Sequence, residues 1–255
     1  MKKYELTAEF IEQWGKKLFR IKALISFGSV EAGELGGYVE KEDNLAQDGD
    51  AWVCGNAWVC DDAWVYGNAR VYGNARVYGN AWVYGNARVY GNARVCDDAR
   101  VYGNAWVYGN AWVCDDAWVC DDAWVYGNAW VYGNAWVYGN ARVYGNAWVY
   151  GNARVCDDAR VCDDARVYGN ADYLLIGRIG SRFSFTTFFK NKDKGITVSC
   201  GCFLGTIAEF RAKVTDTHGN NKHAKMYNLA ADMAELQILG EEHFDKLNTN
   251  KSEPF

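Results

Sequence analysis

Residues 63–74 read AWVYGNARVYGN, one six-residue phrase written twice with Trp64 exchanged for Arg70. The phrase recurs without insertion or loss as twenty consecutive hexapeptides from Ala51 to Asn170. Each unit contains Ala, then Trp or Arg, then Val, then Tyr or Cys, and ends in Gly-Asn or Asp-Asp. Self-similarity at a short fixed period indicates a repeat architecture in which each unit packs against its neighbours.

The alternation within a unit predicts which side chains are buried. The invariant Ala and Val lie two residues apart, which is the period of a β-strand with one buried face. Gly-Asn or Asp-Asp supplies a corner, because Gly and Asn adopt positive φ and Asp bonds to its own backbone. Nine units carry Arg at the second position, and unpaired guanidinium groups in a narrow core would be costly. We therefore expect Ala and Val to point inward and Trp, Arg, Tyr and Cys to point outward.

The spacing Val-Tyr-Gly-Asn-Ala-Arg resembles the aliphatic-x-x-x-small-x pattern of the hexapeptide-repeat family. The resemblance implies a mainly β fold: a three-sided parallel β-solenoid, wound as a left-handed β-helix with three hexapeptides per coil. Tyr or Cys directly after Val departs from the pattern, in which a small or acidic residue follows. The segments from Phe27 to Val53 and from Gly180 to Phe210 are similar to parts of uncharacterised bacterial and prophage-borne members, some of them labelled acyltransferases.

The repeats divide the chain into three parts. Residues 1–50 are expected to form an N-terminal cap and lead-in, residues 51–170 the solenoid, and residues 171–255 a small α+β domain. Caps are expected at both ends because a solenoid leaves unpaired strand edges there.

Outside the repeats, apolar periodicity predicts ordinary helices and strands. In the N-terminal part we expect a short helix near residues 7–14 and a strand over 18–24. In the C-terminal domain we expect three strands, two helices and a loose tail, with the strands over 173–179, 183–189 and 196–200, and the helices over about 207–215 and 222–239.

Composition limits location and partners. The chain has a net charge of −5, and no apolar run approaches the roughly 20 residues of a membrane helix. The opening MKKYELTAEF lacks the apolar core of a signal peptide. A cytoplasmic location is therefore predicted, in the host cytosol if the chain is phage encoded, with the nine cysteines reduced. Nucleic-acid binding is a less favoured alternative, because the repeats are net acidic and contain no lysine.

Stacking of coils would place the second-position residues in outward columns. Eleven Trp and thirteen Tyr on a thin rod exceed the few hundred Å² of apolar patch that soluble monomers usually expose. Trp, Tyr and Arg also dominate binding hot spots. We expect at least one face to be covered, by further copies of the chain, by a terminal domain or by a protein partner such as a host protein. The predicted binding surface comprises Trp106, Trp124, Trp112, Trp130, Trp118, Trp136, Arg70, Arg88, Arg76 and Arg94.

An enzymatic alternative, an acyltransferase of the same fold, would need a histidine base in a groove between subunits. The repeats contain no histidine, and near-identical units offer no unlike constellation for catalysis. We therefore favour a non-enzymatic scaffold and predict no catalytic residue and no cofactor. The candidate residues of the C-terminal domain are Arg178, Arg182, Cys200, Cys202, His218 and His223, and His243 is the third histidine.

Metal binding is not predicted. Under three-unit stacking, Cys96 and Cys114 are the one pair of repeat cysteines on adjacent coils, and outward columns are not expected to converge on an ion. The Asp-Asp corners at 97–98 and 115–116 could hold a divalent cation. Asp is also a good corner residue, and the twelve repeat aspartates offset the nine repeat arginines.

Overall fold

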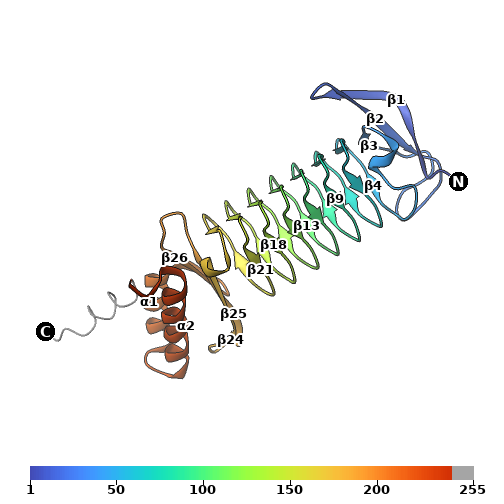
Figure 1. Cartoon of the computed structure of the whole chain (residues 1–255). Coiled ribbons are helices and arrows are strands. Elements are labelled where there is room, and N and C mark those ends of the chain that lie inside the picture. Colours follow the sequence, from blue (N-terminus) through green and yellow to red (C-terminus); the bar gives the residue numbers. More distant parts are fainter. Residues whose placement is uncertain (243–255) are drawn as a thin grey trace.

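A computed structural model describes residues 1–242 and shows a straight β-solenoid with a cap at each end (Figure 1). Every hexapeptide contributes one two-residue strand, from β4 (Trp52–Val53) to β23 (Arg166–Val167). These strands form three parallel sheets, which are the three faces of the rod.

Each face takes every third strand. Face 1 contains β4 (Trp52–Val53), β7 (Arg70–Val71), β10 (Arg88–Val89), β13 (Trp106–Val107), β16 (Trp124–Val125), β19 (Arg142–Val143) and β22 (Arg160–Val161). Face 2 contains β5 (Trp58–Val59), β8 (Arg76–Val77), β11 (Arg94–Val95), β14 (Trp112–Val113), β17 (Trp130–Val131), β20 (Trp148–Val149) and β23 (Arg166–Val167). Face 3 contains β6 (Trp64–Val65), β9 (Trp82–Val83), β12 (Arg100–Val101), β15 (Trp118–Val119), β18 (Trp136–Val137) and β21 (Arg154–Val155).

The coils stack in strict register. Trp106 pairs with Trp124 and Val107 with Val125, so equivalent positions lie 18 residues apart. The Ala and Val side chains of the repeats fill the core and are at most 1% exposed. The predicted three-sided parallel solenoid and the inward direction of Ala and Val are confirmed. Left-handed winding stays a prediction from the resemblance.

The corners explain why Gly-Asn is the commoner ending. Gly127 has φ +73°, and a Cβ added there would lie 3.0 Å from the backbone N of Gly145 in the next coil. Most of the asparagines that follow these glycines donate to the equivalent residue one coil on. One such ladder runs through Asn56, Asn74, Asn92, Asn110, Asn128, Asn146 and Asp164.

Aspartate at the first corner position also adopts a positive φ. Asp115 has φ +56°, and its Oδ2 accepts a hydrogen bond from the backbone N of Gly133 at 3.0 Å. A short acidic side chain therefore tolerates the left-handed backbone and gains a donor from the next coil.

This difference predicts unequal effects of two substitutions at one glycine. Gly127→Val should lower the free energy of unfolding by about 3 kcal/mol, since a β-branched residue at positive φ also crowds the next coil. Gly127→Asp should cost about 1 kcal/mol or less, because it recreates the Asp115 arrangement. Chemical denaturation followed by tryptophan fluorescence measures both, and equal losses would contradict this account of the corners.

The N-terminal cap is an antiparallel three-stranded unit that extends face 2, its last strand pairing in parallel with β5. It consists of β1 (Tyr4–Gln13), β2 (Lys16–Ala23) and β3 (Leu35–Val39), followed by the 3-10 turn η1 (Glu42–Asn44). The helix predicted near residues 7–14 is wrong, whereas the strand predicted over 18–24 is confirmed. Trp14 and Gly15 have φ of 51° and 77° and form a tight turn, so residues 4–13 pair with β2. Long-range strand pairing overrides the local helical preference.

Glycines let this cap close on the first coil. A Cβ at Gly36 would lie 2.4 Å from Ile21 and 2.6 Å from the carbonyl oxygen of Val53. At Gly37 it would lie 2.4 Å from the carbonyl oxygen of Ala57. The Gly36-Gly37 pair is therefore required by close packing of β3 against the first repeats.

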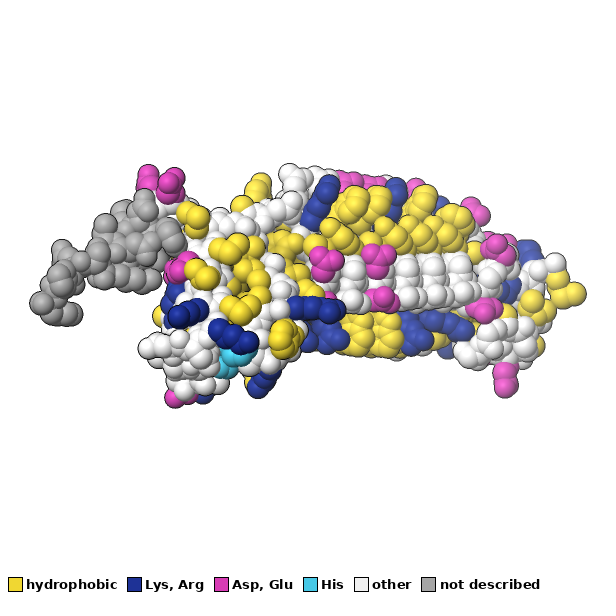
Figure 2. Space-filling model, turned by 90° about the horizontal axis from the view of Figure 1, so that it is seen from below, with side chains coloured by type: hydrophobic (Ala, Val, Ile, Leu, Met, Phe, Trp, Pro, Cys, Tyr) yellow, Lys and Arg dark blue, Asp and Glu magenta, His cyan; other side chains and the backbone are white. Residues whose placement is uncertain are grey.

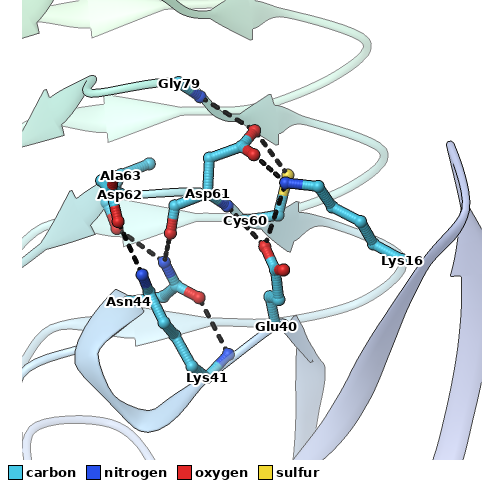
Figure 3. Close-up of polar contacts among 9 residues, drawn as sticks. All are labelled: Lys16, Glu40, Lys41, Asn44, Cys60, Asp61, Asp62, Ala63 and Gly79. Carbon is cyan, nitrogen blue, oxygen red and sulfur yellow. Dashed lines mark hydrogen bonds and ion pairs between the residues drawn. The ribbon is translucent and has the colours of Figure 1, made fainter.

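Polar contacts fix the cap to the first acidic corner, as Figure 3 shows. Lys16 forms an ion pair with Asp61, and Lys41 Nζ lies 2.7 Å from Asp62 Oδ1. The buried Asn44 amide donates to two backbone carbonyls of this corner at 3.0 and 2.9 Å. Both aspartates of this corner are thus used by the cap.

The C-terminal domain packs two helices on a four-stranded antiparallel sheet. It begins with a 3-10 turn η2 (Asn170–Asp172) and continues as β24 (Tyr173–Ile179), β25 (Ser184–Lys190), β26 (Ile196–Cys200), β27 (Phe203–Thr206), α1 (Ile207–His218) and α2 (Lys222–Leu239). The three predicted strands and both helices are confirmed, and β27 is an additional short strand. The predicted loose tail lies outside the described residues.

The same domain closes the last coil. Phe189 is buried in the solenoid core, and the Thr187 hydroxyl accepts a hydrogen bond from the backbone N of Arg160 at 3.1 Å. Lys192 Nζ lies 2.6 Å from Asp164 Oδ2, so a second Asp-Asp corner is used by a cap. Both open ends predicted from the repeats are therefore covered.

Candidate functional site: the outer faces and a C-terminal cavity

Six consecutive units carry Trp and encircle the middle of the rod in two full coils. We call this set the tryptophan belt: Trp106, Trp112, Trp118, Trp124, Trp130 and Trp136. All six side chains point outward and are half-buried against one another, as predicted. The coil before the belt carries Arg on every face, at Arg88, Arg94 and Arg100.

Belt rings stack face to face between the two coils. Ring centroids lie 5.1 Å apart for Trp106–Trp124 and 4.7 Å for Trp112–Trp130, and Trp118–Trp136 is closest at 4.6 Å. Interplanar angles of these pairs are 6° or less. Stacking covers the ring faces that meet, so each pair presents the edges of two indole rings outward and is held rigid by the stack.

Guanidinium groups lie over the rings that border the belt. Arg94 lies 4.3 Å from the Trp112 ring, and Arg88 lies 4.9 Å from Trp106. On face 3, Arg100 is sandwiched between Trp82 and Trp118, at 5.0 and 4.9 Å. An Arg can thus take the place of a Trp beside a neighbouring ring of the column, each such contact contributing about 0.5–1 kcal/mol.

The columns are not equally exposed. Trp52 and Trp58 begin faces 1 and 2 but are only 1% and 4% exposed beneath the N-terminal cap. On face 3, Trp64 and Trp82 are 38% and 37% exposed. Of the predicted arginines, Arg76 lies 5.7 Å from the covered Trp58 ring. Figure 2 shows hydrophobic side chains gathered in bands along the solenoid and bordered by cationic ones.

Tyrosines form a second outward column beside each Trp/Arg column. Tyr72, Tyr90 and Tyr108 stack with centroids 4.8 Å apart. Burial, together with the neighbouring tyrosines, raises the pKa of Tyr90 to about 12. These rings stay neutral near physiological pH and widen the apolar surface.

Thiols take the tyrosine position in seven units, and burial raises the pKa of several of them. Burial raises the pKa of Cys60 and Cys162 to about 11. A hydrogen bond to Cys114, with burial, raises the pKa of Cys96. A thiol rather than a thiolate is a poor nucleophile, so Cys60, Cys96 and Cys162 behave as packing residues in the described chain.

The residue after Val and the corner of the same unit vary together along the repeats. Six of the seven Cys units end in Asp-Asp, and all thirteen Tyr units end in Gly-Asn. The structure gives a reason: Cys60 Sγ donates to Asp61 Oδ2 at 3.3 Å, and the same oxygen accepts from Gly79 N at 3.2 Å. The sequence contains this pairing of Cys with Asp-Asp, and the contact that explains it is seen only in the folded chain.

Two groups of described side chains could hold a metal ion. Ligand atoms of Cys96, Asp97 and Cys114 lie within 4.8 Å of one another, so the adjacent thiols do converge with a carboxylate, contrary to expectation. The reason is that coil stacking adds the next residue, Asp97, to the pair. A second group, Glu40, Cys60 and Asp61, already has the Lys16 ammonium among its carboxylates.

The candidates of the C-terminal domain partly converge. Arg182, Cys200, Cys202 and His218 line one cavity of about 200 Å³, together with residues of β25, α1 and α2. Arg178 is exposed outside this lining, and His223 has a buried Nδ1 with no hydrogen-bond partner in residues 1–242. His243 lies outside the described residues.

Within this cavity the thiols and the imidazole are not joined. Thr186 Oγ1 donates to Cys200 Sγ at 3.2 Å and Arg182 lies 3.9 Å from Cys202 Sγ. His218 stacks on the Tyr227 ring at 5.8 Å, and no hydrogen bond links it to a thiol in the described chain. A nucleophile–base pair is therefore not assembled here within residues 1–242.

Neither helix of the described chain is long and apolar enough to cross a membrane.

The family described as YdcK Beta solenoid repeat matches the chain at residues 69–85, 81–97, 93–109, 99–115, 123–139, 135–151 and 159–171. A comparison with curated proteins finds no match. The matched segments cover the solenoid from residue 69 with two gaps, and the last one ends in the turn η2, while the N-terminal cap lies outside them. The chain is therefore a β-solenoid repeat protein whose repeats are similar to the YdcK β-solenoid repeat.

Proposed function

We propose that the protein is a non-enzymatic scaffold of the cytoplasm that self-associates through face 3 of its solenoid. The observation that carries this proposal is the outward column Trp64, Trp82, Arg100, Trp118, Trp136 and Arg154. Four of its six members are indoles, and neither cap buries them as the N-terminal cap buries Trp52 and Trp58. Exposed aromatic surface of this extent on a rigid sheet is typical of an interface.

The order of residues on face 3 is complementary to itself. A second copy docked antiparallel, by a two-fold axis between the coils of Arg100 and Trp118, places Arg100 opposite Trp118 of that copy. The same operation sets Arg154 opposite Trp64, and Trp82 opposite Trp136. Every arginine then lies opposite an indole and no two arginines meet, so like-charge repulsion across the interface is avoided.

A swap experiment tests this pairing. Trp118→Arg should weaken self-association by about tenfold or more, because two arginines then meet across the interface. Adding Arg100→Trp to the same chain should restore association, since each arginine again faces an indole. The swaps use residues that the repeats already exchange, so the fold is expected to tolerate them. Sedimentation velocity over a concentration series measures all three proteins.

Trp124→Arg on face 1 is the matched control, because it makes the same chemical change in the belt away from face 3. It should leave the dissociation constant within about twofold of the wild type. If Trp118→Arg and Trp124→Arg weaken association equally, or the double swap fails to restore it, face 3 is not the interface.

A protein of another kind is the second candidate partner, and face 1 favours it. Its column begins Trp52, Arg70, Arg88, and a two-fold axis through Trp106 sets Arg70 against Arg142 of a second copy. Face 1 is therefore less complementary to itself than face 3. Binding of such a partner protein that persists in Trp118→Arg but is lost in Trp124→Arg would support this candidate.

A further inference from the structure

The C-terminal cavity has an apolar floor and no acidic side chain. Phe203, Phe210, Val214 and the ring of Tyr227 line its interior, and the volume is about 200 Å³. Drug-sized sites measure about 300–1000 Å³, so this cavity suits a smaller molecule. None of its lining residues is Asp or Glu, although the chain as a whole is net acidic.

Basic groups define the charge that the cavity accepts. Lys213 belongs to the lining but lies 3.0 Å from the Asp216 carboxylate, which offsets its charge. Arg182 is exposed and has no carboxylate partner within residues 1–242. One permanent cation is thus left without a counter-charge at the cavity, and it matches a single negative charge.

Unusual backbone geometry surrounds Arg182. Arg178 and Phe183 have φ of 50° and 48°, and Gly180 between them has φ 71°. A Cβ on Gly180 would lie 1.9 Å from the Tyr227 hydroxyl, so this turn packs closely against Tyr227, which lines the cavity. Residues in sparsely populated backbone regions cluster at ligand sites, where the surrounding structure holds the strain.

We propose that this cavity binds a small monocarboxylate that carries an aromatic or branched aliphatic group. The carboxylate pairs with the Arg182 guanidinium, and the apolar group lies against Phe203, Phe210 and Val214. Hydroxyl groups of Ser181 and Ser184, which also line the cavity, are available to the second carboxylate oxygen. This site is separate from the solenoid faces, and the proposal of a ligand here does not depend on self-association.

Isothermal calorimetry of the full chain with 3-phenylpropionate tests the site, with 3-phenylpropionamide and phenyl phosphate as comparison ligands. The carboxylate should bind about tenfold or more tightly than the neutral amide, because a charge-assisted bond to Arg182 is lost in the amide. Arg182→Gln should remove that difference. Arg178→Gln, a matched change outside the lining, should keep it.

Protection of a thiol locates the bound molecule. 3-Phenylpropionate should slow alkylation of Cys202, which lines the cavity, and leave that of Cys114 on the solenoid unchanged. The proposal is overturned if no carboxylate binding is detected at about 10 mM, if the amide binds as tightly as the acid, or if Arg182→Gln has no effect. Tighter binding of phenyl phosphate would overturn the assignment to a monocarboxylate.

Discussion

Val125→Asp is expected to unfold the middle of the solenoid. Val125 is fully buried among the Ala and Val side chains of the core, where a carboxylate would have neither water nor a counter-ion. Burying an unpaired charge or its protonated form in such a core should cost at least about 4 kcal/mol. Chemical denaturation monitored by tryptophan fluorescence should show a large fall in the midpoint, or no folded protein at all.

The neighbouring residue provides the control. Trp124→Arg also introduces a charge, but on the outer side of the same strand, in a column where Arg70 and Arg88 are already paired neighbours. This change should alter stability by about 1 kcal/mol or less. Comparable losses from Val125→Asp and Trp124→Arg would contradict the assignment of inner and outer positions.

The second large effect is expected for Arg211→Met in the C-terminal domain. Arg211 Nη2 lies 2.7 Å from Asp232 Oδ1 and 2.7 Å from Glu235 Oε2, and Glu235 is buried. Removing the guanidinium leaves a buried carboxylate without its counter-charge, which should cost about 3 kcal/mol. Hydrogen exchange of the α2 amides, read by mass spectrometry, should accelerate accordingly.

A compensating change distinguishes lost charge pairing from lost packing. In the double variant Arg211→Met with Glu235→Leu, the buried carboxylate is gone as well, and most of the protection in α2 should return. Unchanged exchange in the single variant would show that the ion pair does not hold α1 and α2 together.

The solenoid could be predicted because its signal is repeated. Ala and Val recur at a fixed spacing over twenty units, so one argument about the cost of buried arginine orients every strand. The N-terminal cap has no such redundancy. Residues 4–13 have an ambiguous local pattern, and only pairing with β2 across the Trp14-Gly15 turn makes them a strand.

Prediction of the candidate sites from the sequence was limited in the same way. The outward Trp and Arg columns follow from the repeat period, and their register is as predicted. Burial of Trp52 by Phe27, at 5.4 Å, depends on a cap whose fold the repeats do not encode. The convergence of Arg182, Cys202 and His218 depends on how α1 crosses the sheet, and no spacing in the sequence contains that information.

The mass of the wild-type chain in solution tests the central claim most directly. Sedimentation equilibrium at micromolar concentration should give twice the 28.6 kDa of one chain, with reversible dissociation on dilution. A mass of 28.6 kDa at every concentration would contradict self-association through face 3.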